Sequence, residues 1–126
     1  MENVKIALRV TAQGLETYRF AGDGSKTDNT IKFTDTHGDV YEFVIGVSEV
    51  RMQKSGVSPL ILRFVEGQTT MGELKMDGMA LTLSIATNKL IIGHYGFQTD
   101  YCMNEEHDAM THRMVLKWDG RTRDND

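Results

Sequence analysis

Three residue types occur only once in this chain of 126 residues: cysteine at Cys102, proline at Pro59 and tryptophan at Trp118. A single cysteine excludes an intrachain disulfide, which favours a reducing compartment. The proline directly precedes a stretch that alternates apolar with polar side chains. The start of a strand is one of the few places where a sheet tolerates proline.

Long apolar runs are also missing. No window approaches the roughly 20 apolar residues of a membrane-spanning helix. The first ten residues, MENVKIALRV, have an acidic second residue and alternate polar with apolar. They therefore lack the basic start and the unbroken apolar run of a signal peptide. We expect a cytoplasmic protein with no membrane partner.

Positive charge is not clustered anywhere along the chain. The net charge is −4. The basic residues are scattered singly, among them Lys5, Arg9, Arg19, Lys32, Arg51, Arg63, Lys75 and Lys117. Binding to a phosphate backbone needs a basic run or a basic face. We therefore expect no nucleic acid among the partners of this protein.

Motifs for catalysis and cofactor binding are absent from the sequence. Gly22-Asp23-Gly24-Ser25 lacks the lysine and the helix that follow the glycines of a phosphate-binding loop. No G-x-S-x-G, H-E-x-x-H or paired-cysteine pattern occurs. The acidic residues after Cys102, Glu105 and Glu106, oppose the thiolate that a nucleophilic cysteine needs. We expect no enzyme activity, no catalytic residues and no cofactor.

His107, Asp108 and His112 form the pattern that comes nearest to a metal site. A metal site needs ligands that converge on one point at roughly 2.0–2.2 Å. The two histidines are five residues apart, so on one strand they would point to opposite faces. We therefore predict no metal site and interpret this segment as an acidic loop beside a strand histidine.

The chain does contain period-two alternation of apolar and polar residues over most of its length. This alternation is typical of half-buried strands, and turn-forming residues separate the strands every 8–12 residues or so. No segment longer than ~10 residues keeps a helical period. The expected strands cover residues 4–10, 15–21, 31–34, 40–45, 47–52, 60–65, 69–76, 79–86, 90–97 and 110–118.

These strands predict an all-β protein, an antiparallel up-and-down meander that closes into a barrel of about 8–10 strands. Closure is favoured because it removes both open strand edges. A β-sandwich is the second candidate. We expect one domain over residues 1–120 and a polar tail over 121–126. Turns are predicted in the segment AGDGSKTDN, residues 21–29, which contains Gly22–Ser25, and at Asn88-Lys89, with a tight bend at Gly93 and Gly96 inside the strand 90–97. Phe64, Leu74, Leu81 and Leu83 are predicted to line the barrel.

The segment Arg63-Phe64-Val65-Glu66-Gly67-Gln68-Thr69-Thr70 resembles the YwiB-like family of small bacterial proteins. The resemblance continues through Lys75-Met76, Leu81-Thr82-Leu83 and Thr87, and Met52–Gly56 is similar to the hairpin that precedes this core. It implies a calycin-type, lipocalin-like barrel of unknown function. It brings no established catalytic residues.

Two functions remain open at this stage. In the first, the barrel binds a small apolar or amphipathic molecule, because a barrel interior can leave room for one ligand and methionine and aromatic residues are abundant. Arg63, His94 and Tyr95 are then the candidate ligand-binding residues; an outward-facing arginine on a half-exposed strand is the alternative for Arg63. In the second, the chain is an interaction module, as a homodimer or with another partner, through a strand edge or an apolar patch.

Overall fold

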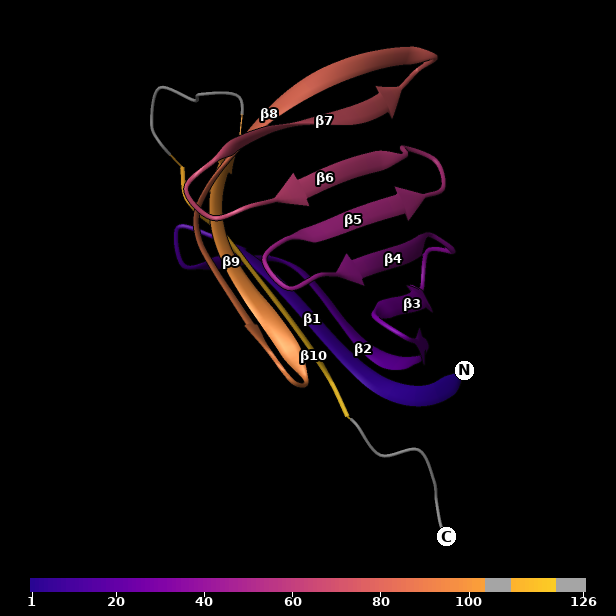
Figure 1. Ribbon diagram of the computed structural model, residues 1–126. Helices are drawn as coiled ribbons and strands as arrows, with labels where there is room; N and C mark the ends of the chain where they lie inside the picture. Colours follow the sequence, from indigo (N-terminus) through magenta and orange to yellow (C-terminus); the bar gives the residue numbers. More distant parts are fainter. Residues whose placement is uncertain (104–109, 120–126) are drawn as a thin grey trace, which may run out of the picture.

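The computed structural model describes residues 1–103 and 110–119, which form ten antiparallel strands closed into one barrel (Figure 1). The strands are β1 (Glu2–Ala12), β2 (Leu15–Thr27), β3 (Thr30–Thr34), β4 (Val40–Ile45), β5 (Val50–Ser55), β6 (Leu60–Phe64), β7 (Thr69–Met76), β8 (Met79–Gly93), β9 (Gly96–Met103) and β10 (His112–Trp118). Each strand pairs with its neighbours in sequence, and β1 also pairs with β10. The predicted all-β meander and its closure are confirmed. Within the described ranges, no helix is long and apolar enough to cross a membrane.

The alternation in β1 explains how the first and last strands meet. Val4, Ile6 and Leu8 are buried, whereas the residues between them point outward. Leu8 stands opposite Leu116 of β10, which is also buried. Because a slip of one residue would turn every apolar side chain outward, the alternation also sets the register of closure.

Aromatic side chains fill the middle of the barrel. Phe43 of β4 and Phe97 of β9 come from opposite walls, yet their ring centroids are 5.8 Å apart. Phe64 of β6 contacts Tyr101 of β9 in the same way, at 4.8 Å. These cross-barrel contacts leave the two ends of the barrel as the places where space for a ligand can remain.

The segment 21–29 does contain a turn, at Asp28-Asn29, but Gly22–Ser25 are not part of it, because β2 continues through them to Thr27. Gly22 and Gly24 stand opposite Ile6 and Val4 of β1. A Cβ on Gly24 would crowd the Ile6 side chain and come within 2.7 Å of the Lys32 carbonyl oxygen. The glycines therefore allow close approach between strands, and the turn lies beyond them, after Thr27.

Two further turn predictions need correction in β8 and β9. The chain does not turn at Asn88-Lys89, because β8 runs on to Gly93 and absorbs the irregularity as a register shift between Thr87 and Lys89. The bend predicted at Gly93 and Gly96 is the β8–β9 turn itself, with Gly93 paired to Gly96 across it. The segment 90–97 therefore belongs to two strands.

The β7–β8 hairpin extends past the end of the barrel wall (Figure 1). β8 pairs with β7 from Met79 onward, but its pairing with β9 begins only at Ile85. Phe64 and Leu83 are buried as predicted, whereas Leu81 is exposed and Leu74 only half-buried. Leu81 has the alternation of an inward residue, but it is exposed, and between Met79 and Leu83 no described strand other than β7 pairs with β8.

Candidate functional site

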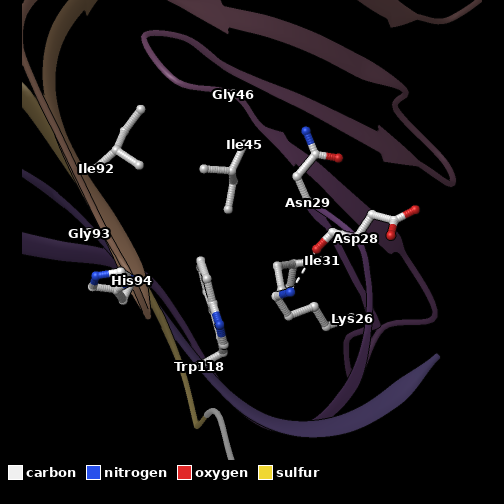
Figure 2. A pocket seen from close by; sticks show the side chains of 10 residues that line it. All are labelled: Lys26, Asp28, Asn29, Ile31, Ile45, Gly46, Ile92, Gly93, His94 and Trp118. Carbon is white, nitrogen blue, oxygen red and sulfur yellow. Dashed lines mark hydrogen bonds between the residues drawn. The ribbon is translucent and has the colours of Figure 1, made fainter.

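A pocket of about 250 Å³ opens at the end of the barrel where β10 finishes (Figure 2). We call it the Trp118 pocket. The β2–β3, β4–β5 and β8–β9 turns surround it. Its lining consists of Lys26, Asp28, Asn29, Ile31, Ile45, Gly46, Ile92, Gly93, His94 and Trp118.

Backbone hydrogen bonds between turns hold the rim of this pocket. The Ile45 N–H donates to the Asn29 carbonyl at 2.9 Å, which ties the β4–β5 turn to the β2–β3 turn. The Trp118 N–H donates to the Tyr95 carbonyl at 2.9 Å, which ties the end of β10 to the β8–β9 turn. Segments that are far apart in the sequence are thus fixed around one opening.

The walls of the pocket are apolar. Ile31 is completely buried and Trp118 is 7% exposed, while Ile45 and Ile92 are half-buried and reach the opening. Figure 2 shows the Trp118 ring standing between His94 and Lys26, with Ile45 beyond its end. Two lining residues neighbour the Phe43–Phe97 contact, since Ile31 stands opposite Phe43 and Ile92 opposite Phe97, but the contact itself does not line the pocket.

Polar groups are confined to the rim, with one exception. The Lys26 Nζ donates to the Asp28 carbonyl at 2.7 Å, and Asp28 adopts a left-handed backbone conformation with φ of 54°. The exception is the Trp118 Nε1–H, which is shielded from solvent and donates to no group of residues 1–103 and 110–119. A buried donor without a partner costs about 1–3 kcal/mol, so it is uncommon in a folded protein.

The three predicted binding residues lie in different places. His94 is exposed on the rim of the Trp118 pocket. Tyr95, its neighbour in the turn, lines a separate hollow on the outer wall with Ile91. Arg63 points outward from β6, where its Nε and Nη2 donate to the carboxylate of Glu49 at 3.0 and 3.1 Å.

Sequence reasoning missed most of the lining of this pocket. The sequence singles out neither Lys26 nor Ile92 for a site, and Trp118 is a buried core residue that also lines the pocket. One signal was available: a tryptophan at the end of a strand brings a large apolar ring and an N–H that needs a partner. The lining comes from segments separated by up to about 90 residues (26 to 118), so spacing alone could not assemble it.

A polar cluster occupies the opposite end of the barrel. The Tyr18 hydroxyl donates to Asp35 Oδ2 at 2.9 Å, and the backbone N–H groups of His37 and Asp39 donate to Asp35 Oδ1 at 2.9 and 3.0 Å. Burial alone would raise the pKa of Asp35, but these hydrogen bonds outweigh it and lower the pKa below its ordinary value. The cluster fixes the β3–β4 turn and leaves this carboxylate fully engaged.

The largest of the described hollows, about 470 Å³, lies on the outer wall over β1, β2, β9 and β10. Long exposed side chains of Arg9, Arg19 and Lys117 border it. Arg9 and Arg19 both pair with Glu16, at 3.1 and 3.0 Å. Such pairs are mobile in water, so this hollow is less defined than the Trp118 pocket, whose walls belong to the core.

The other residues considered in the sequence are spread over the molecule. His107 and Asp108 lie outside the described residues, as does the tail 121–126. The His112 ring stacks on Tyr101 at 5.2 Å. Cys102 lies in β9, half-buried, with its Sγ 3.9 Å from the Thr111 hydroxyl oxygen.

No family model and no curated protein matches this chain. Among solved structures, it is similar to the crystal structure of the ywiB protein from Bacillus subtilis, with a TM-score of 0.68 and 19% sequence identity. The match covers 96% of this chain and 93% of that chain. The likeness extends over the whole barrel, and it shows that the protein has a YwiB-like fold.

Proposed function

We propose that this protein binds a small apolar or amphipathic molecule in the Trp118 pocket. The observation that carries this proposal is a hollow of about 250 Å³ whose walls are buried or half-buried apolar side chains and whose polar groups lie at the rim. Ligand sites usually have this composition, an apolar lining with a few placed polar groups. The mouth of a β-barrel is one of their common positions.

The size of the pocket limits the ligand. Its volume equals that of about eight waters at ~30 Å³ each, below the range of ~300–1,000 Å³ for drug-sized ligands. The Phe43–Phe97 contact occupies the interior next to the lining residues Ile31 and Ile92. A short chain or a single ring therefore fits, whereas a long lipid would extend into solvent.

The proposed role is binding in the cytoplasm, without catalysis. The buried carboxylate of Asp35 is at the opposite end of the barrel and already accepts three hydrogen bonds. The lone Cys102 supports a reducing compartment. We also propose, on the resemblance of Arg63–Thr70, that the barrel is of the calycin type and of bacterial origin.

Trp118 is the single tryptophan, so its fluorescence reports on this pocket alone. We expect 1-hexanol to change that fluorescence in a saturable way, and native mass spectrometry of protein purified from its host to show a retained small molecule. In the Ile92→Phe variant the added ring should fill the pocket and abolish the hexanol response. Ile91→Phe is the matched control, because Ile91 points outward.

Arg63→Ala is a second control, since Arg63 pairs with Glu49 on the outer wall. Its hexanol response should equal that of the wild type. The proposal is wrong if hexanol leaves Trp118 unchanged and the indole N–H resonance in the NMR spectrum does not shift. It is also wrong if Ile91→Phe and Ile92→Phe weaken the response equally.

A second candidate function is homodimer formation through the β7–β8 hairpin. Between Met79 and Leu83, β8 pairs with β7 on one side, and no described strand pairs with its other side. The run Met79–Thr87 contains no charged residue or proline, the usual protection of a free edge. Apolar side chains on the hairpin are exposed, namely Met71, Met76, Met79 and Leu81.

The dimer is tested by light scattering after size-exclusion chromatography. A second copy pairing antiparallel with this edge should give twice the mass of 14.2 kDa. Thr82→Lys should return the monomer, because lysine on a free edge opposes pairing. Gln53→Lys, on the exposed face of β5 between two paired strands, is the control. A wild-type protein that stays monomeric at high concentration would exclude this function.

A further inference from the structure

We infer that the ligand of the Trp118 pocket is a small monocarboxylate, whose negative charge is held by Lys26 and whose apolar part lies along Trp118, Ile45 and Ile92. This inference rests on the proposed function and adds the chemical class of the ligand. It follows from the charge at the rim, which the apolar walls do not determine.

Lys26 is a cation without an acidic partner. Among the described residues it forms no ion pair, although Lys5, Arg9 and Arg19 on β1 and β2 each pair with a carboxylate. Glu2 stands opposite Lys26 in the β1–β2 ladder but is not ion-paired with it. Lys26 as a whole is half-buried, and its ammonium is available at the pocket rim.

The position of the ammonium is fixed by the β2–β3 turn. Its hydrogen bond to the Asp28 carbonyl, 2.7 Å long, uses one of its three protons. Two protons remain for a ligand at the opening. A carboxylate has two oxygens that can accept them, and hydrogen bonds between charged groups are about twice as strong as those between neutral ones.

The other polar groups of the rim compete only weakly with a ligand carboxylate for the Lys26 ammonium. Figure 2 shows the Asp28 carboxylate and the Asn29 amide directed away from the Trp118 ring, and both residues are exposed. His94 lies on the far side of the ring from Lys26 and offers a second donor. An ion pair beside apolar walls is screened less than one in open water, so the charge of Lys26 acts most strongly on a group inside the opening.

The arrangement sets the orientation of the ligand. With its carboxylate at Lys26, its apolar part lies between the Trp118 ring and the two half-buried isoleucines, Ile45 and Ile92. The single ammonium of Lys26 balances a single negative charge, which favours a monocarboxylate as the ligand. A neutral alcohol gains the apolar contacts only, and an amine faces the like charge of Lys26.

Three ligands that differ only in the head group test this inference: hexanoate, 1-hexanol and hexylamine. Each is titrated into the full chain while Trp118 fluorescence and the indole N–H resonance are followed. Hexanoate should bind about tenfold more tightly than hexanol, a difference of about 1.4 kcal/mol, because its charged head group accepts a hydrogen bond from the Lys26 ammonium. Hexylamine should bind the most weakly.

Lys26→Met keeps the apolar stem and removes the charge. It should weaken hexanoate about tenfold and leave hexanol unchanged. Lys32→Met, on the exposed outer face of β3, is the matched control and should change neither. Circular dichroism of both variants should match that of the wild type, which separates loss of binding from loss of folding.

Each outcome decides between the two proposals. Equal affinity for the three ligands, tightest binding of hexylamine, or no effect of Lys26→Met would overturn the carboxylate while leaving an apolar pocket in place. A fluorescence and NMR response to none of the three would overturn the pocket itself. A preference for hexanoate that Lys26→Met removes and Lys32→Met retains supports both.

Discussion

Phe43 and Phe97 meet across the barrel, with ring centroids 5.8 Å apart and ring planes at 51°. Phe43 is completely buried and Phe97 nearly so. The tilted arrangement is one that aromatic pairs favour. The contact joins the wall that contains β4 to the wall that contains β9, and both rings stand opposite residues that line the Trp118 pocket, Ile31 and Ile92.

Phe43→Ala should lower the free energy of unfolding by about 3–5 kcal/mol, the usual cost of removing a buried phenylalanine ring. The loss should be large because the ring is packed on both walls and neither can move in to fill the space. Urea denaturation followed by circular dichroism measures it. Leu15→Ala, at an exposed position, is the control and should change stability by no more than about 0.5 kcal/mol.

The Asp35 cluster predicts a loss of stability in acid. The pKa of Asp35 is lower in the folded protein than in the unfolded chain. The contribution of the Asp35 carboxylate to folding stability is therefore complete above about pH 4, the ordinary pKa of an aspartate. It is lost as the pH falls further, through the folded pKa. Tyr18→Phe should cost about 1–3 kcal/mol at pH 7, because the carboxylate loses a donor.

Asp35→Asn is the variant that isolates this effect. It should be less stable than the wild type at pH 7, and its urea midpoint should decline less steeply between pH 4 and pH 3. The urea midpoint of this variant should still decline somewhat in acid, because Arg113 lowers the pKa of Asp100. Arg63 likewise lowers the pKa of Glu49. Parallel decline of the two proteins over that range would contradict the assignment to Asp35.

The strand pattern could be predicted because burial in a barrel follows alternation. Period two alone places Val4, Ile6, Leu8 and Val10 on one face of β1; the first three are buried and Val10 is half-buried. Closure also followed, since ten strands with alternating faces leave two edges that need partners. Local pattern could not show that the β7–β8 hairpin outgrows the wall, because Leu81 has the same alternation as the buried Leu83.

The main errors in the predicted turns occur at glycine residues. Gly22 and Gly24 were interpreted as turn residues, yet they lie in β2 opposite β1. A glycine serves either a positive φ or a close approach of two chains, and one sequence does not distinguish these uses. Gly67 and Gly78 are the first kind, with φ of 77° each.

The pocket was beyond prediction for a different reason. Its lining converges from four separate segments, and only the closed barrel brings Lys26, Ile45, Ile92 and Trp118 together. Arg63 was selected for its charge next to an apolar strand face. That criterion finds a side chain beside the core but does not tell on which side of the wall it points.

Tyr101 predicts a loss of stability in alkali. Burial raises the pKa of this phenol to about 12, above the ordinary value near 10. The contribution of Tyr101 to folding stability is therefore complete below about pH 10. It is lost as the pH rises toward 12, where the phenol also ionises in the folded protein. Tyr101→Phe should have nearly wild-type stability at pH 7 and a smaller decline above pH 10. An unchanged alkaline decline would assign the effect to Tyr18 and Tyr41, whose pKa values burial also raises.

Gly24→Ala tests whether β2 requires close approach to its neighbours. A Cβ there would meet the Ile6 side chain and would lie 2.7 Å from the backbone oxygen of Lys32, which cannot move without disturbing β3. We expect the free energy of unfolding to fall by about 1–3 kcal/mol, the usual cost of overpacking a core.

Gly93→Ala is the matched control, because its Cβ would lie 3.8 Å from the Gly96 carbonyl oxygen, an ordinary contact. If both variants unfold at the wild-type urea concentration, Gly24 is not needed for packing. If residues 22–25 lay outside the β2 strand, the added methyl group would not meet a neighbouring strand and the stability would not change. Fast hydrogen exchange of the backbone amides of these residues would reveal that arrangement.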